Sequence, residues 1–153
     1  MSRLDEIKSQ LGAEWLPAIY EKRVRSQRTR SIELEIPERQ NTVEIQYTLL
    51  GIELKVGKRR IASPDLATAR YMRVFARLGC RSFAIPYNIT KISVIADELE
   101  TVWQRTLLLL VGDKRASSAI IKSIRREVGE IGAGDAMPEF NTAASTRSMP
   151  RKK

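Results

Sequence analysis

Apolar and polar residues alternate along two neighbouring stretches of the chain, residues 43–49 and 51–56. Successive side chains of a strand point to opposite faces of a sheet, so each stretch predicts a strand with one apolar face. Residues 31–36 alternate in the same way. We therefore expect three consecutive strands in an antiparallel meander, followed by a short fourth strand around residues 60–62.

Apolar residues at helical spacing predict helices on both sides of these strands. They span residues 4–22, 64–78, 91–111 and 114–128. Pro17 should kink or split the first helix, because its ring removes a hydrogen bond. Ser63 can cap the second, with Pro64 in its first turn and Asp65 at the positive end of its dipole. A short apolar run at residues 82–85 adds one more strand.

The order of these elements predicts an α+β fold: an N-terminal helix, a three- to four-stranded mainly antiparallel sheet, then helix–strand–long helix–helix. The chain of 153 residues suits one domain, which we expect over residues 1–131. Composition then shifts to Gly, Ala, Ser and Thr, so residues 132–153 are predicted to form a flexible basic tail. Residues 107–111 are apolar all round, which indicates either the centre of the core or a homodimer interface formed by the 91–111 helix.

The charge of the chain favours an anionic partner. Lys and Arg number 27 against 18 Asp and Glu, which gives a net charge of +9. Nucleic acid is the commonest polyanion, so DNA or RNA is the expected partner, and an acidic protein is the alternative. The residues predicted to contact phosphate are Arg23, Arg25, Arg28, Arg30, Lys58, Arg59, Arg60, Arg70, Arg73 and Arg77.

Two of these basic segments have a second interpretation. Residues 22–30 form either a phosphate-binding arm or a solvated linker. Arg70, Arg73 and Arg77 lie on one stripe of the predicted helix, and that helix offers them no carboxylate one turn away. The stripe therefore indicates either a phosphate-binding surface or a solvated helix face.

Composition also excludes several kinds of chemistry. The chain has no histidine and a single cysteine, which rules out imidazole catalysis, His-metal sites and Cys-rich zinc sites. Cys80 is expected to be a buried structural thiol, because no histidine is present to activate it. A single cysteine cannot form an internal disulfide, so a reducing cytoplasmic setting is expected. The N-terminus is too charged for a signal peptide, and no apolar run is long enough to span a membrane.

One tripeptide suggests catalysis. Glu53-Leu54-Lys55 lies on the third predicted strand, and the order helix–three strands–helix–strand–helix surrounds it. This order and tripeptide resemble the PD-(D/E)xK nuclease superfamily. The resemblance implies that Glu44 and Glu53 bind Mg²⁺, that Lys55 stabilises the attacking hydroxide, and that Glu14 is an accessory acid. Bound Mg²⁺ would lower the pKa of its water.

The polar face that carries these residues has an equally simple structural interpretation. All three strands place polar residues on it, which is typical of a solvated sheet face with cross-strand ion pairs. The sequence therefore predicts a nucleic-acid-binding protein with an arginine-rich surface and no cofactor. The alternatives are a Mg²⁺-dependent nuclease and an adaptor that docks an acidic protein.

Overall fold

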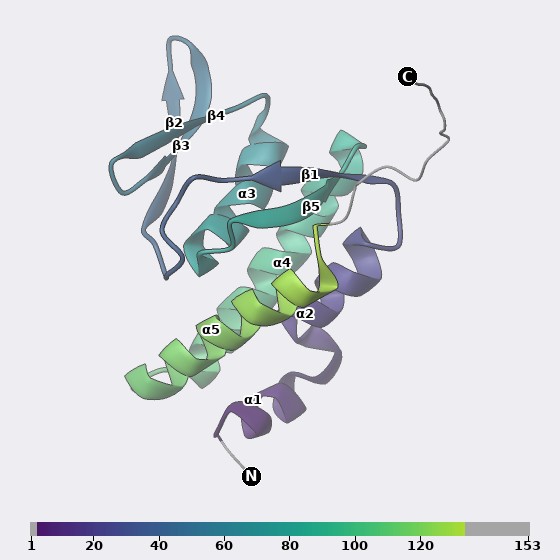
Figure 1. Ribbon diagram of the computed structural model, residues 1–153, viewed down its shortest axis with the longest axis vertical. Coiled ribbons are helices and arrows are strands. Elements are labelled where there is room, and N and C mark those ends of the chain that lie inside the picture. The colour runs from purple at the N-terminus through teal and green to yellow at the C-terminus, as the bar shows by residue number, and fades with distance from the viewer. Residues whose placement is uncertain (1–2, 134–153) are drawn as a thin grey trace.

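A computed structural model of the chain describes residues 3–133, which form several helices and two small antiparallel sheets (Figure 1). The predicted α+β fold is confirmed. The N-terminal elements are α1 (Arg3–Leu11), a 3₁₀ turn η1 (Gly12–Glu14), α2 (Leu16–Ile19) and a π-helical turn η2 (Tyr20–Val24). The strands are β1 (Thr29–Glu33), β2 (Val43–Thr48), β3 (Gly51–Val56), β4 (Arg59–Ser63) and β5 (Ser82–Pro86). The remaining helices are α3 (Leu66–Leu78), α4 (Ile89–Leu109) and α5 (Lys114–Ile131).

The meander consists of β2, β3 and β4. Val43 lies opposite Val56 and Ile45 opposite Leu54, as the alternation predicts. The apolar face of this sheet packs against α3, and Val43, Leu54 and Val56 are buried there. The short fourth strand is confirmed, with Arg59 opposite Val56.

The first predicted strand is not part of this meander, so that part of the prediction is wrong. β1 pairs with β5, with Ile32 opposite Phe83, and the two strands form a separate sheet. The backbone of Leu34 continues this pairing through a 2.8 Å hydrogen bond to the carbonyl of Arg81. An amphipathic strand can satisfy its backbone on any free strand edge, and the chain between residues 34 and 42 is long enough to carry β1 away from β2.

Four aromatic residues from three elements form the centre of the core. The rings of Phe75 and Phe83 stack with centroids 4.4 Å apart, and Tyr71 packs 5.1 Å from Phe75. Tyr20 meets Phe75 edge-on at 5.5 Å. All four are fully buried, so they join η2 and α3 to the β1–β5 sheet.

The N-terminal helix is split, as Pro17 predicts. α1 passes through η1 to Trp15, whose extended backbone ends the first segment. Pro17 then lies in the first turn of α2, where a missing backbone N–H costs no hydrogen bond.

The capping residue predicted for α3 is wrong by two positions. Asp65, not Ser63, accepts the backbone N–H of Thr68 at 2.7 Å, and the Ser63 hydroxyl donates to the carbonyl of Asp65. Both residue types cap well, and the extended backbone at Asp65 decides between them. At the other end, Gly79 has a φ of +78° and closes the helix.

α4 runs from the upper right to the lower part of Figure 1 and packs against α3, β5 and the N-terminal helices. Asn88 caps it by accepting the N–H of Lys91. Its C-terminal end is only partly buried: Leu110 is buried, whereas Leu108 and Val111 are 73% and 78% exposed. Burial on every side is therefore not seen within the chain, and a homodimer that covers these two residues stays a prediction.

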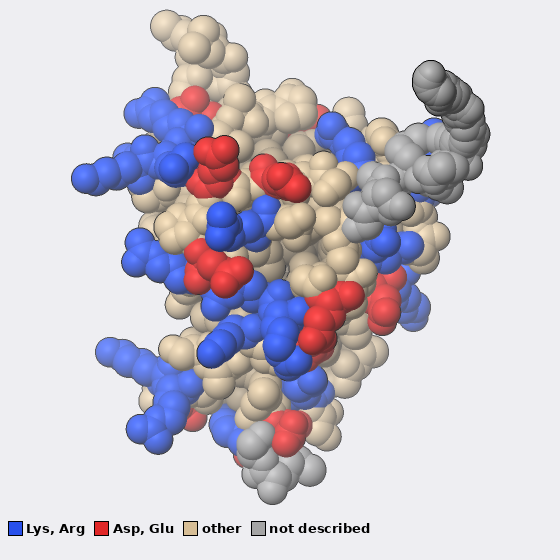
Figure 2. Space-filling model, in the orientation of Figure 1, with Lys and Arg blue, Asp and Glu red and all other residues tan. Residues whose placement is uncertain are grey.

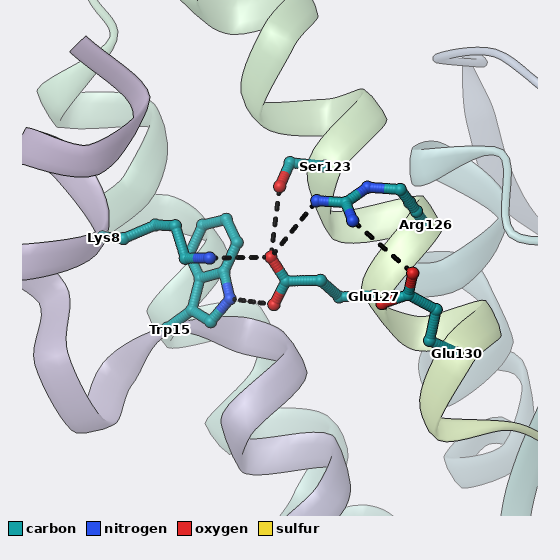
Figure 3. A network of polar contacts seen from close by, with 6 residues as sticks. All are labelled: Lys8, Trp15, Ser123, Arg126, Glu127 and Glu130. Carbon is teal, nitrogen blue, oxygen red and sulfur yellow. Dashed lines mark hydrogen bonds and ion pairs between the residues drawn. The ribbon is translucent and has the colours of Figure 1, made fainter. Parts of the chain in front are cut away.

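Glu127 on α5 ties the N-terminal helices to the rest of the domain (Figure 3). Its carboxylate accepts hydrogen bonds from Lys8 at 2.8 Å and from the indole of Trp15 at 2.7 Å. Ser123 adds a third at 3.2 Å. Two helices from opposite ends of the sequence are thus held by one carboxylate.

α5 ends at Ile131, and the predicted tail from residue 134 onward lies outside the described residues. Within residues 3–133, none of the helices combines the length and apolar character that crossing a bilayer requires.

Candidate nucleic-acid interface

The polar face of the β2–β4 sheet brings together the residues of the ExK tripeptide. Glu44 lies directly opposite Lys55, and Glu53 lies two pairs further along on the same face, opposite Gln46. The predicted juxtaposition is therefore present. However, Arg60 on β4 donates to the Glu53 carboxylate at 3.1 Å, and no group of three metal-ligating side chains occurs among residues 3–133. A divalent cation at Glu53 would have to compete with a guanidinium.

The basic residues of the β3–β4 turn have acidic neighbours. Arg59 contacts the Glu35 carboxylate at 3.3 Å, and Arg60 contacts Glu53. Lys58 is exposed at the turn itself. Figure 2 shows the same intermixing of Lys and Arg with Asp and Glu over the described part of its face. The charge of this turn is largely balanced, which weakens its attraction for a polyanion.

The arginine stripe of α3 finds on α4 the carboxylates that its own helix lacks. Arg70 pairs with Asp97 and, at 2.8 Å, with Glu100, and Arg73 pairs with Glu100 at 2.5 Å. Hydrogen bonds to Asp97 and then Glu100 raise the pKa of Arg70. Burial, together with the neighbouring charge of Arg73, lowers the pKa of Arg77. Arg70 and Arg73 thus join two helices.

The four arginines that precede or begin β1 have different surroundings. Arg25 donates to the Thr29 hydroxyl at 3.3 Å, and Arg30 is exposed on β1. The guanidinium of Arg28 lies 5.7 Å from the ring centre of Tyr87, which follows β5. Tyr87 is 48% exposed, so this cation–π pair presents an aromatic surface to solvent.

Arg23, the fourth of these arginines, lines a pocket of about 400 Å³ between η2 and the start of α4. Its cations are Lys22, Arg23 and Lys91, and its walls are completed by Ser26, Gln27, Thr90, Val94 and Ile95. We call this the η2–α4 pocket. Among the described residues that line it there is no Asp or Glu. Cations from two separate segments thus converge on a pocket whose described lining holds no carboxylate.

Local hydrogen bonds shape this pocket. The Ser26 hydroxyl donates to the carbonyl of Lys22 at 2.6 Å, and the Gln27 amide donates to the carbonyl of Arg23 at 2.7 Å. These side chains occupy the carbonyls that end η2, where partial negative charge would otherwise gather. The opposite wall begins at the Asn88 cap, where the dipole of α4 is positive. The C-terminal end of η2 is therefore less negative than a bare helix end, and the N-terminal end of α4 favours an anion.

A second, larger hollow of about 660 Å³ continues from this pocket along α2 and α4. The two share Lys22, Arg23 and Val94. Arg23 contacts Glu98 at 3.6 Å at their junction, and beyond it Arg105 pairs with Glu14. Glu14, a candidate accessory acid, is therefore part of an interhelical ion pair.

Cys80 is buried, and burial raises the pKa of its thiol to about 12. The predicted burial of Cys80 is confirmed, and a thiol with so high a pKa carries almost no thiolate near neutral pH.

The basic run before β1 marked one side of the pocket in the sequence, through Arg23 and its neighbour Lys22. The other side was missed. Lys91 and Thr90 come from the start of α4, more than sixty residues later, and Tyr87 follows β5. The Asn88 cap was the signal that could have placed Lys91 in an anion-attracting first turn.

No model of a known protein family matches the chain, and no curated protein and no solved structure is significantly similar to it.

Proposed function

We propose that the protein binds nucleic acid, and that the contact is centred on the η2–α4 pocket. The observation that carries this proposal is the convergence of Lys22, Arg23 and Lys91 on one hollow whose described lining holds no carboxylate. Neither lysine has an ion-pair partner within residues 3–133, so both charges are available to a phosphate.

The surroundings of the pocket support the same partner. Arg28 directly follows Gln27, and Tyr87 directly precedes the Asn88 cap of α4. The exposed ring of Tyr87 offers an aromatic face, and such faces stack with bases of any sequence. Phosphate contacts fix position and carry no sequence information. The proposed activity is therefore binding that depends on charge and stacking rather than on base identity, in a protein whose buried thiol fits a reducing cytoplasm.

Fluorescence anisotropy with labelled DNA and RNA, single- and double-stranded, across a series of salt concentrations tests the proposal. Affinity should fall steeply with salt, and a Lys22→Gln, Lys91→Gln double variant should flatten the slope by about 0.7 to 0.9 for each lost phosphate contact. The matched control is Lys114→Gln, Arg115→Gln, which removes the same charge at the start of α5. Both control residues are exposed, and the start of α5, to which they belong, lies far from the start of α4 in Figure 1.

Two results would overturn this assignment. Equal losses in both variants would mean that net charge alone, not the pocket, attracts the strand. No binding to any DNA or RNA would leave an acidic protein as the partner to seek. The same labelled strands are also incubated with the protein and Mg²⁺, and cleavage is measured. Cleavage that requires Mg²⁺ and vanishes in Lys55→Ala would favour a nuclease.

A further inference from the structure

The charge of the groove between α2–η2 and α4 changes along its length. In the η2–α4 pocket the lining carries three cations, and no Asp or Glu is among the described residues there. In the adjoining hollow, Glu14, Asp97 and Glu98 join Lys22, Arg23 and Arg105, so cations and carboxylates are equal in number. A polyanion that enters from the Arg28 and Tyr87 side therefore meets carboxylates as soon as it passes Arg23.

This change in charge sets a limit on how a strand lies in the groove. The phosphates of a strand that continued through both hollows would leave the excess of cations, because Glu98, Asp97 and Glu14 of the second hollow each pair with an arginine. A strand that ends in the first pocket keeps its phosphate where cations are in excess. The geometry thus favours the end of a strand over its middle.

The number of available charges fits a terminal phosphate. An internal phosphodiester carries one negative charge, whereas a phosphomonoester carries about 1.5 to 2 near neutral pH. Arg23 shares its charge with Glu98, which leaves the full charges of Lys22 and Lys91 from opposite walls of the pocket. Two lysines and a partly neutralised arginine match a dianion better than a monoanion.

The remaining wall suits the rest of the terminal nucleotide. Val94 is 51% exposed and lies beside buried Ile95, so the pocket has an apolar side for a sugar or base to pack on. At about 400 Å³ it falls within the range of pockets that hold small ligands, roughly 300–1,000 Å³. Arg28 directly follows Gln27 of the pocket lining, so the Arg28–Tyr87 pair is the aromatic surface that we assign to the next base.

From these observations we propose that the η2–α4 pocket binds the phosphorylated end of a nucleic-acid strand. This inference rests on the proposed function and names the part of the strand that the pocket takes. The shared chemistry is a terminal phosphomonoester, which occurs on either end of a strand.

The test compares oligonucleotides of one sequence with a 5′-phosphate, a 3′-phosphate or hydroxyls at both ends, each labelled within the strand and measured with the whole chain. One of the phosphorylated strands should bind about tenfold more tightly than the hydroxyl strand, which corresponds to about 1.4 kcal/mol. The arm that shows the gain identifies the end. The preference should disappear in Lys22→Gln, Lys91→Gln and persist in Lys114→Gln, Arg115→Gln.

A second variant guards against an effect on folding. Val94→Glu places a carboxylate at an exposed position of the same wall, and it should abolish the preference while the thermal unfolding midpoint stays close to that of the wild type. Equal affinity for phosphorylated and hydroxyl strands in the wild type would overturn the inference and leave nucleic-acid binding in place. A preference that survives in the pocket variants would also overturn it. Absence of binding to every strand would instead overturn the proposed function, and the inference with it.

Discussion

The hydroxyl of Tyr20 accepts the backbone N–H of Ala84 at 2.8 Å. It also donates to the carbonyl of Gly132 at 2.7 Å, and Tyr71 donates to the carbonyl of Ala84 at 2.6 Å. Ala84 lies on β5 opposite Ser31, so two phenols satisfy the backbone of β5 in the core. Burial raises the pKa of both phenols, so each keeps the proton that it donates. The β1–β5 sheet can therefore consist of two strands without leaving the buried N–H and carbonyl of Ala84 unpaired.

Removing either hydroxyl should destabilise the domain. Tyr20→Phe and Tyr71→Phe each keep the buried ring but leave a polar group of Ala84 without its partner, which costs about 1–3 kcal/mol. Urea unfolding measures this loss. Tyr47→Phe is the control, because the side chain of Tyr47 is 71% exposed and its hydroxyl can bond to water. Losses no larger than that of the control would show that the two hydrogen bonds contribute nothing net.

Gly79 offers a test of close packing between α3 and the loop before β2. A Cβ at this position would overlap the carbonyl oxygen of Arg39, in addition to the strain of a φ of +78°. Gly57 is a matched control, with a φ of +61° and open space around its Cβ. Gly57→Ala should cost about 1–2 kcal/mol from backbone strain alone. Gly79→Ala should cost about 1–3 kcal/mol more, because the loop must move. Equal losses in urea unfolding would contradict this.

Local pattern predicted most of the elements but not all of their partners. The strands of the meander, the four helical regions and the stop at Gly79 follow from alternation, helical spacing and end signals that lie within each segment. The partner of β1 does not. Nothing in the alternation of residues 31–36 distinguishes the edge of β2 from that of β5. The hydroxyls of Tyr20 and Tyr71, which hydrogen-bond to the backbone of β5 at Ala84, come from positions far apart in the sequence.

Only one of the two walls of the η2–α4 pocket was predicted from the sequence. A run of cations between residues 22 and 30 pointed to one wall of the pocket, because charge density can be read locally. Lys91 looked like an ordinary helix residue until α4 was placed against η2. For Arg70 and Arg73, the sequence predicted that their own helix offers no carboxylate partner, but it could not show that Glu100 on another helix pairs with both.

The ion pairs between α3 and α4 should matter for stability rather than for binding. Burial would raise the pKa of Glu100, but hydrogen bonds from Arg70 and Arg73 outweigh it and the pKa is lowered. Glu100→Gln removes the charge that both arginines share, and Arg73 already has a buried Nε without a partner among the described residues. We expect a loss of about 1–3 kcal/mol.

Paired measurements separate the two roles. Arg73→Gln should destabilise the domain in urea about as much as Glu100→Gln, and the double variant should lose less than the sum of the two single losses. The exposed Arg115→Gln is the control. If Arg73→Gln instead weakened binding to nucleic acid and left stability unchanged, the α3 stripe would be part of the nucleic-acid-binding surface.

Glu127 should make the stability of the domain depend on pH. Burial works against its charged form, but hydrogen bonds from Lys8, Trp15 and Ser123 prevail and lower its pKa from the ordinary value of 4.5. A lowered pKa means that the contribution of Glu127 is fully present above pH 4.5 and is lost as the pH falls through the folded-state value. Glu127→Gln should therefore be less stable than the wild type near neutral pH, and the gap should narrow in acid. The control, Glu130→Gln, changes a side chain that is 65% exposed on the same helix. Urea unfolding from neutral pH down to below pH 4.5 measures the difference in the free energy of unfolding between Glu127→Gln and the wild type. A difference that does not change with pH would mean that the charge of Glu127 does not hold α1 and α5 together.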